Sequence, residues 1–550
     1  MSNIHENKSN GEKSYIANHS YEFSKFRSLV KDNTNFQSVQ KQGKSFFSNA
    51  KSDLGNLIVA TSEIKEGKFL EAIQRFEFIL KKDPYYESAH SLYINLLLKV
   101  NNTIKLEKAL FSAHKYNPEN HDFLNLLGKH LIGIGKKKES LPYFESAVEK
   151  NPHSCQYWIE LGFTYLTLRN IDMASLCLKT AQDIDYNNKQ CYQLRGLLLQ
   201  DDLKYKEAIK TFQKGLELYP HDQNLILNLA VLYLKTNNKK KGYELYNLIE
   251  TSSRTNLHAA INYTITDKTK VHINEIKDLT KADLKLNKKI KILVFFEQGF
   301  GDYLNFLRFL KPLANLGHLI TALGPHDSII PLLQYSNCPK NISLETKINN
   351  EDVQFFHRKT IIGNLPFLLD FTDKMPSPII FDKIKIEKHN KPLLSKFKKL
   401  LKGNMNIGVS WKGSKRHLGD EARSIDLELF SKIFKNENYR FFVIDKELSD
   451  IDKHFLKKFS NVYLCDRLIN DWVDTAIIVS NLNKIITVDT SLVHIGGTLE
   501  IPTKVLLPAD PDWRWGVKGT RTKWYKTVSL IRQKDRDNWE DVIKDLVKNP

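Results

Sequence analysis

Residues 485–497, IITVDTSLVHIGG, pass directly from a short apolar, β-branched strand into a helix. We expect the strand, 485–488, to deliver Asp489, Thr490 and Ser491 to the helix N-terminus. Unpaired backbone N–H groups and the positive end of the helix dipole favour a phosphate or pyrophosphate there. The same residue types commonly cap helices, so this segment alone leaves an anion site and a simple cap as open alternatives.

The composition predicts a multi-domain protein. The chain has 550 residues, of which 41% are hydrophobic, enough for several buried cores. No apolar run approaches the length that crosses a bilayer, and residues 1–14 lack the apolar core of a secretory signal. We therefore expect no transmembrane segment and a cytoplasmic location. Five scattered cysteines, with no C-x-x-C pair or zinc-like Cys/His spacing, predict free structural thiols.

The net charge of +19 is compatible with nucleic-acid binding, because clustered Lys and Arg neutralise phosphates. The lysines, however, are spread through repeats and loops beside abundant Asn, a pattern typical of solvated faces. Aromatic RNP strings, zinc fingers and a KH-like GXXG loop are absent from the sequence. We expect no nucleic-acid partner, while surface contact with acidic partners stays open.

Prolines in the first half recur with the period of the tetratricopeptide repeat. Pro84, Pro118, Pro152 and Pro220 are separated by 34, 34 and 68 residues, and 68 is twice 34. One position of this period carries the small residues Ala60, Gly128, Gly162 and Gly196, another Ala72, Ala174 and Ala208, and a third Phe76, Phe144 and Phe212. Paired helices pack closely where a small side chain faces a large one, and proline ends the second helix.

This period predicts about six repeats over residues 51–250, which form an α-solenoid. Residues 1–50 are rich in Asn, Ser, Lys and Gly, which predicts a flexible N-terminal arm. Residues 251–289 form a polar connector to the second half.

The second half alternates between strand and helix patterns. Residues 291–296, KILVFF, predict a buried strand, which a glycine-containing turn joins to a helix over 303–316. A second such unit opens with the strand 406–411, NIGVSW, and the basic loop KGSKRHLGDEARS. A helix from about Asp426 and strands at 439–444 and 503–507 follow. This alternation predicts parallel sheets with ligands at the carboxyl ends of the strands, and two units predict a cleft between them.

The turn after the first strand, EQGFGD at 297–302, suits a close approach of the backbone to a ligand. Gly299 and Gly301 permit the tight turn, and Asp302 begins the following helix, where it could also serve only as a cap. The third glycine of a dinucleotide fingerprint would fall at Leu304, which disfavours NAD. We expect no cofactor.

Four strings in this order resemble the heptosyltransferase-like glycosyltransferases, particularly bacterial members fused to tetratricopeptide repeats. The strings are the EQGFGD turn, VSWKGS with the later Arg423-Ser424, DTSLVHIGG, and the tail LLPADPDWRWG. The resemblance covers residues 290–550 and implies an α + α/β chain, in which a Rossmann-like, two-lobed GT-B domain follows the repeats. Its acceptor lobe would span residues 290–400 and its nucleotide-sugar lobe residues 401–550.

The resemblance also implies an activity, transfer of a sugar from a nucleotide-diphosphate donor to a protein or glycan acceptor, with inversion and without a metal. Asp302 would be the general base for the acceptor hydroxyl. The leaving pyrophosphate needs cations and N–H donors, and the residues implied for donor binding are Lys412, Lys415, Arg423, Asp489, Thr490, Ser491 and His494. Family members usually place a lysine in the basic loop, and the corresponding place here lies nearer Arg423.

Several alternatives accompany this interpretation. His494 would lie one helical turn after Thr490, or it is a core histidine. Ser491 stands where simple heptosyltransferases commonly carry glycine, so heptose specificity is not transferable. Trp513, Trp515 and Trp524 could wall the nucleotide, although packing is favoured.

The repeats would recruit the acceptor or a protein partner through their concave surface. The main alternative function is a non-catalytic scaffold with a degenerate transferase domain. Protein O-linked N-acetylglucosamine transfer shares the repeat-plus-GT-B plan but fits the late segment less well.

Overall fold

The computed structural model describes residues 53–249, 273, 275–285, 288–296, 299–324, 328–348, 350–371, 375–401, 405–414 and 419–548. The predicted arm, 1–50, and most of the predicted connector, 251–289, lie outside these residues. The chain divides into two compact units, Met1–Leu127 and Gly128–Pro550. No helix in the described ranges is long and apolar enough to span a bilayer.

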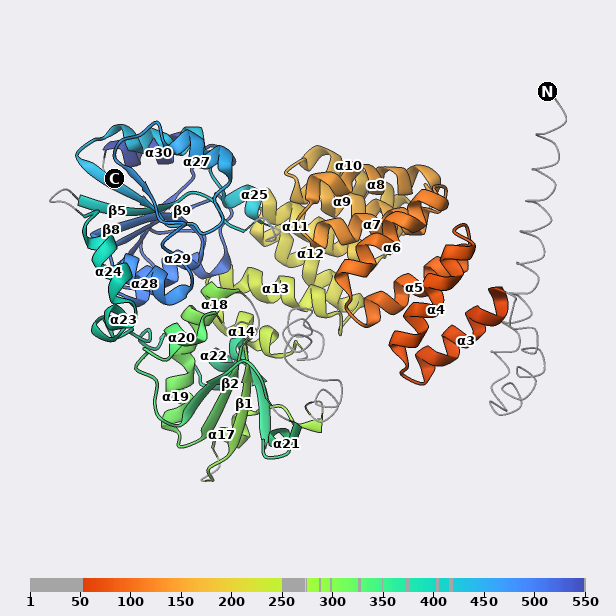
Figure 1. Cartoon of the computed structure of the whole chain (residues 1–550), viewed down its shortest axis with the longest axis horizontal. Coiled ribbons are helices and arrows are strands. Elements are labelled where there is room, and N and C mark those ends of the chain that lie inside the picture. The colour runs from red at the N-terminus through yellow and green to blue at the C-terminus, as the bar shows by residue number, and fades with distance from the viewer. Residues whose placement is uncertain are drawn as a thin grey trace. The chain divides into compact units, whose positions relative to one another are not determined.

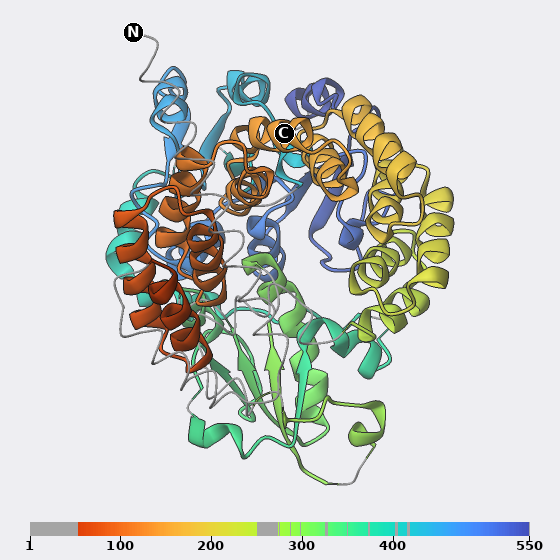
Figure 2. The ribbon, with the colours of Figure 1, turned by 90° about the vertical axis from the view of Figure 1, so that its right-hand side faces the viewer.

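The described residues from 53 to 247 form helix pairs that repeat every 34 residues (Figure 1). The first helices of the pairs are α3 Asp53–Lys65, α5 Glu87–Lys99, α7 His121–Gly133, α9 Cys155–Thr167, α11 Lys189–Asp201 and α13 Gln223–Lys235. The second helices are α4 Phe69–Lys82, α6 Thr103–Tyr116, α8 Lys137–Lys150, α10 Ile171–Ile184, α12 Tyr205–Leu218 and α14 Lys239–Asn247. Within the second unit, successive pairs from α9 to α14 stack side by side (Figure 2). The predicted solenoid of repeats is confirmed.

The pairs close because a residue without a side chain faces an aromatic ring. A Cβ atom added to Gly196 would lie 2.3 Å from the ring of Phe212, and one added to Gly128 would lie 2.8 Å from Phe144. Both rings are fully buried. The aromatic ring therefore occupies the space that a side chain at the glycine would take, as the periodic small and aromatic positions predict.

The turn inside each helix pair repeats a left-handed backbone position as well. The residues with positive φ are Gly67 (77°), Asn101 (54°), Gly135 (85°), Arg169 (67°), Leu203 (58°) and Asn237 (67°), again 34 residues apart. This conformation suits glycine and, less well, asparagine, and costs other residues about 1–2 kcal/mol. Arg169 and Leu203 adopt it because the packed helices on either side fix the turn.

The first sheet after the repeats has the strand order β3-β2-β1-β4, and all its strands are parallel. The strands are β1 Lys291–Phe295, β2 Leu319–Leu323, β3 Ile342–Glu345 and β4 Arg358–Ile361. The helices of this lobe are α17 Lys281–Leu284, α18 Phe300–Phe306, η3 Leu307–Phe309, α19 Leu310–Asn315, α20 Ile330–Leu333, α21 Asn350–Val353, η4 Ile362–Asn364 and α22 Leu365–Leu368. The single helix predicted over 303–316 is thus two α-helices joined by a 3₁₀ turn. It begins earlier, because Gly299 is already its N-cap.

The second sheet has the order β10-β9-β8-β5-β6-β7, also parallel throughout. Its strands are β5 Met405–Ser410, β6 Tyr439–Val443, β7 Val462–Leu464, β8 Lys484–Val488, β9 Thr503–Leu507 and β10 Val528–Arg532. Its helices are α25 Asp420–Arg423, α26 Leu427–Phe430, η5 Ser431–Lys435, α27 Asp450–Leu456, α28 Trp472–Ser480, α29 Ser491–Thr498, η6 Trp513–Trp515 and α30 Glu540–Lys548. The first strand in the chain is central and the order runs outward on both sides, as in a Rossmann sheet. Parallel sheets are confirmed, whereas the GT-B assignment stays a prediction.

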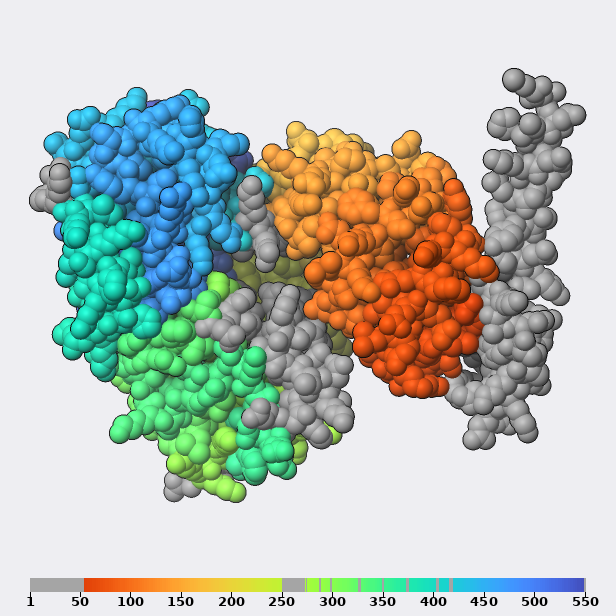
Figure 3. Space-filling model, in the orientation of Figure 1, coloured from red at the N-terminus to blue at the C-terminus, as the bar shows by residue number. Residues whose placement is uncertain are grey.

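Two helices that precede residue 401, α23 Lys383–His389 and α24 Lys391–Lys398, pack on α28 of the second lobe. Figure 3 shows the teal atoms of this part of the chain against the blue atoms of the second lobe. The ring of Phe397 in α24 lies 5.1 Å from that of Phe442 in β6. The lobe boundary at residue 400 stays a prediction, and α23 and α24 contact the second lobe before it. The chain joins the helix layer of the second lobe before it forms that lobe's first strand.

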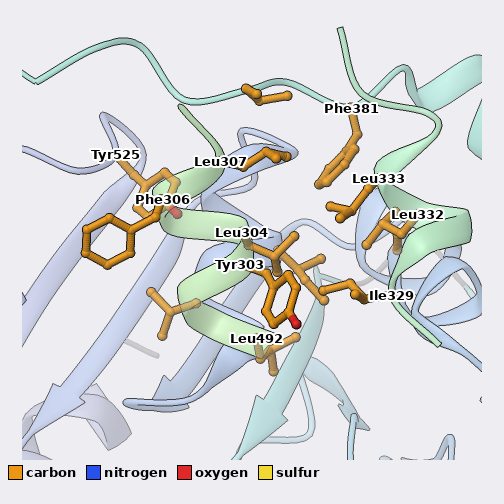
Figure 4. Close-up of a cluster of buried hydrophobic side chains, with 14 of the residues drawn as sticks. Tyr303, Leu304, Phe306, Leu307, Ile329, Leu332, Leu333, Phe381, Leu492 and Tyr525 are labelled. Carbon is orange, nitrogen blue, oxygen red and sulfur yellow. The ribbon is translucent and has the colours of Figure 1, made fainter. Parts of the chain in front are cut away.

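Both sheets contribute to one apolar core at their junction (Figure 4). Tyr303, Leu304 and Leu307 of α18 and η3 lie between Leu492 of the second lobe and Leu332 of the first. Four of these side chains are almost entirely buried, and Leu492 is 5% exposed. Since α18 is the helix that follows β1, this core fixes the turn with Asp302 relative to the second sheet.

The left-handed turn at Leu203 generates a stability prediction. Leu203→Gly should raise the free energy of unfolding by about 0.5–1 kcal/mol, because glycine removes the backbone penalty and the leucine side chain is 42% exposed. Urea denaturation of the full chain measures the change. The matched control is Leu176→Gly in α10, a side chain that is 53% exposed, which should cost about 1 kcal/mol. A loss of stability in both variants would contradict the argument.

Candidate active site

The strand and helix predicted around residue 489 are both present. β8 ends at Val488, Thr490 is the N-cap, and α29 begins at Ser491. The Thr490 hydroxyl accepts from the backbone N–H of Leu492 at 3.3 Å and lies 3.2 Å from the hydroxyl of Thr487. Thr490 therefore caps the helix, since its hydroxyl accepts from the N–H of Leu492 and its carbonyl oxygen from the N–H of Val493 at 3.1 Å.

This helix N-terminus lies where ligands bind in sheets of this topology. The strand order reverses direction between β5 and β8, and the crevice at the carboxyl ends of two such strands is the usual ligand site. The basic loop leaves β5 at this point, and Asp489 leaves β8 beside it. The two segments thus start from the same edge of the sheet.

Arg423 is the basic-loop residue that reaches the segment after β8. Its Nη1 donates to the carbonyl oxygen of Asp489 at 2.8 Å, and its Nε donates to Asp420 at 3.2 Å. A Cβ at Gly413 would lie 2.4 Å from the guanidinium of Arg423, so the backbone at Gly413 and this side chain are in close contact past the end of β5.

Lys412 makes a different contact, because its ammonium lies 2.6 Å from the carboxylate of Asp452 and 3.9 Å from that of Asp445. The charge of Lys412 is thus compensated by carboxylates that follow β6. Lys415 lies outside the described residues. Of the three basic candidates, Arg423 has the observed contact to the Asp489-Thr490 segment.

Gly299, Gly301 and Asp302, which follow β1, lie at the corresponding point of the first sheet, where the strand order reverses between β1 and β4. Gly299 caps α18, and Gly301 and Asp302 form its first turn. Helices α18 and α29 pack together, and a Cβ at Gly301 would lie 2.8 Å from the ring of His494. The two motifs, almost two hundred residues apart in sequence, therefore meet across the two lobes.

His494 lies inside this contact rather than on an open phosphate site. It is 4% exposed, and its Nδ1 lies 3.1 Å from the hydroxyl of Tyr525. Its ring stacks on Trp515 at a centroid distance of 5.8 Å. Burial lowers the pKa of His494 to about 3, so the imidazole is neutral near pH 7. This geometry favours the alternative of a core histidine.

Asp302 is paired across the lobes with Arg514, a residue that the sequence did not single out. Nη2 of Arg514 donates to Oδ1 of Asp302, and Nη1 donates to Asp512 at 2.8 Å. The side chains of Arg514 and Asp302 are 9% and 18% exposed. Burial lowers the pKa of Arg514 to about 10, which leaves the guanidinium charged. Arg514 lies in the tail string LLPADPDWRWG, in which no residue pattern marked it as a functional side chain.

Carboxylates and guanidinium groups alternate across this junction. Burial, and after it the nearby carboxylate of Asp489, raise the pKa of Asp512. Arg514 lies between Asp512 and Asp302, and Arg423 contacts the backbone of Asp489. Among the described residues, no group of three or more His, Cys, Asp or Glu side chains is arranged to hold a metal ion.

The tryptophans of the tail pack the lobe junction. Trp515 and Trp524 are 3% and 4% exposed, and Trp524 lies 6.0 Å from Trp513 in an edge-to-face contact. The indole N–H of Trp524 donates to the carbonyl oxygen of Arg514 at 2.8 Å. These contacts agree with packing and help to fix the backbone that carries Arg514.

Residues 156–188 and 190–222 match the family model of the tetratricopeptide repeat. A segment of 158 residues is 25% identical to BBSome complex member BBS4 of Bos taurus, over 28% of this chain and 30% of that protein. The UDP-N-acetylglucosamine–peptide N-acetylglucosaminyltransferase of Giardia intestinalis is 25% identical over 25% of this chain and 10% of its own length. Protein O-mannosyl-transferase TMTC3 of Homo sapiens is 26% identical over 34% of this chain and 20% of its own. The chain thus spans less than a third of the length of each of these relatives.

Solved structures of repeat proteins are similar to part of the chain. A tetratricopeptide repeat protein from Parabacteroides merdae is 14% identical, covers 39% of this chain and 91% of its own, and gives a TM-score of 0.33. A thermophilic repeat protein of Thermus thermophilus is 18% identical, covers 33% of this chain and 100% of its own, and gives a TM-score of 0.27.

Because α18 and α29 approach closely at Gly301, we expect a methyl group added there to destabilise the protein. Gly301→Ala should lower the free energy of unfolding by about 1–3 kcal/mol, because the added Cβ overlaps the His494 ring in a packed junction. Gly299→Ala is the matched control, since no atom lies within 4 Å of its added Cβ and its φ is −73°. Urea denaturation of both full-length variants gives the comparison. Equal stability of the two variants would show that the helices do not meet at Gly301.

Proposed function

We propose that this protein is a glycosyltransferase that moves a sugar from a nucleotide-diphosphate donor to a protein or glycan acceptor. The observation that supports the proposal most is the packing of α18 on α29. Each helix follows a strand at which the order of its sheet reverses; α18 carries Asp302, and α29 contributes its N-terminus. A carboxylate is thereby brought near a site suited to a pyrophosphate. The partial similarity to two sugar-transferring proteins supports the same class.

In the proposed reaction, Asp302 removes the proton of the acceptor hydroxyl as that oxygen bonds to the anomeric carbon. The bond from this carbon to the donor phosphate breaks on the opposite face, so the configuration inverts. The electron pair leaves with the pyrophosphate, which the positive end of the α29 dipole and the guanidinium of Arg423 stabilise. Arg514 contacts Oδ1 of Asp302, and in the proposed reaction the other carboxylate oxygen receives the proton.

The donor sugar is proposed only as a class. The two similar transferases are named for N-acetylglucosamine and mannose, and Ser491 replaces the glycine of simple heptosyltransferases. A metal-independent reaction fits a site whose cations are arginines. The repeats supply a surface for a protein acceptor or partner. A degenerate domain is disfavoured by the paired Asp302 and the intact helix N-terminus.

The direct test is a screen of nucleotide sugars against the full chain. A donor that binds only the folded state should raise the melting temperature, since ligand at about 100 times its Kd adds about 2.7 kcal/mol. Slow hydrolysis or transfer should then release the nucleotide, with EDTA present to test metal independence. Binding with no release under any acceptor mixture would favour the scaffold, and no binding would reject the proposal.

The proposed base gives a separate prediction. Asp302→Asn should reduce turnover by about 10²–10⁴-fold, because the amide cannot accept the proton, while the donor still raises the melting temperature. The matched control is Asp541→Asn on α30, a carboxylate that is 43% exposed, which should leave turnover unchanged. Nucleotide release measures both. Unchanged turnover in Asp302→Asn would remove this residue as the base.

A further inference from the structure

The segment 508–516, which follows β9, touches the repeats through Asp510. The carboxylate of Asp510 accepts from Gln200 at 3.0 Å, from the hydroxyl of Tyr205 at 3.0 Å and from the ammonium of Lys235 at 2.6 Å. These donors come from α11, α12 and α13, all in the same compact unit as both sheets. Three neighbouring helices of the solenoid therefore hold one carboxylate of the second lobe.

The lysine of this anchor is buried and its carboxylate is partly buried. Lys235 is 4% exposed, and the Asp510 side chain is 19% exposed. Removing one partner of a buried ion pair leaves an uncompensated charge, so such a pair strongly favours the docked arrangement over a displaced one. The edge-to-face contact between Tyr243 of α14 and Trp513, at 6.4 Å, adds an apolar contact beside it.

The other end of the segment is fixed by the second lobe. Arg532 donates to the carbonyl oxygens of Trp515 at 2.6 Å and Gly516 at 2.9 Å. Gly516 has φ 61° and ψ 179°, a conformation that is essentially restricted to glycine. The segment has thus little freedom between the repeats and the sheet.

Arg514 lies between these two attachments, four residues from Asp510. Its guanidinium lies 4.8 Å from the centroid of Trp513 and 5.6 Å from that of Phe306, and it pairs with Asp302. Aromatic rings and two carboxylates thereby set its position.

We propose that Arg514 is a positioning residue for Asp302, and that helices α11 to α13 of the repeats hold Arg514 in place through Asp510. The inference rests on the proposed role of Asp302. The last repeats are then part of the reaction centre, in addition to any role in recruiting an acceptor. A displacement of the base by about 1 Å can cost a factor of about 10² in rate, so a loosened segment slows turnover without changing donor contacts.

The test compares full-length variants that cut different repeat contacts. Lys235→Met and Arg514→Gln should each lower kcat by about 10–10²-fold, with the KM for the donor within about twofold of wild type. The matched control is Asp537→Asn, which removes an exposed ion pair between Arg169 and the second lobe and should leave kcat unchanged. If Lys235→Met does not fold, Gln200→Ala removes one neutral hydrogen bond to Asp510 instead, with a smaller loss of kcat expected.

A second readout is independent of activity. Hydrogen exchange at the backbone of Phe300–Phe306 should speed up in Lys235→Met, in its substitute Gln200→Ala and in Arg514→Gln, but not in Asp537→Asn. Unchanged exchange there and unchanged kcat in the Lys235 or Gln200 variant would overturn the inference. A raised donor KM with normal kcat in Arg514→Gln would make Arg514 a donor ligand, which also overturns it. If wild type releases no nucleotide from any donor, the proposed function fails, and the exchange pattern alone decides whether the repeats position α18.

Discussion

The buried ion pair between Arg514 and Asp302 is the interaction on which the arrangement of the candidate site depends. It joins the first turn of α18 in one lobe to a loop that follows β9 in the other. A buried guanidinium is costly unless carboxylates compensate it, and here Asp302 and Asp512 both do so. The pair therefore fixes the position of one lobe relative to the other, with Gly301 of α18 next to the first turns of α29.

The apolar contacts around this pair serve the same relation. Gly301 lets α18 approach His494, and Leu492 packs against Tyr303 and Leu304 in one core. A histidine that burial keeps neutral fits here because its ring fills space and its Nδ1 is bonded to Tyr525. Packing, rather than phosphate binding, explains the residues of α29 that face α18.

The sequence predicted those helices and strands that are marked by a pattern of neighbouring residues in the chain. The repeats follow from a 34-residue period, and β1, β5, β6, β8 and β9 follow from apolar runs. The missed strands are β2, β3, β4, β7 and β10. Of these, β3 alternates between exposed and half-buried residues and β7 has only three residues, so neither has an apolar run of useful length. Arg514 was missed for another reason: its partner Asp302 is 212 residues away, and no local pattern encodes such a contact.

The 34-residue spacing of the helix pairs has a consequence for how such a chain can vary. Among the described residues, the donors to Asp510 come from α11 to α13, so whole units inserted or deleted upstream of α9 would leave that attachment in register. Insertion or deletion of a single residue within α11 or α12 would instead rotate one part of the helix against the other by about 100° and move the donor side chain. The number of repeats can therefore vary at the amino-terminal end, whereas the length of the last units is constrained by their contact with the segment after β9.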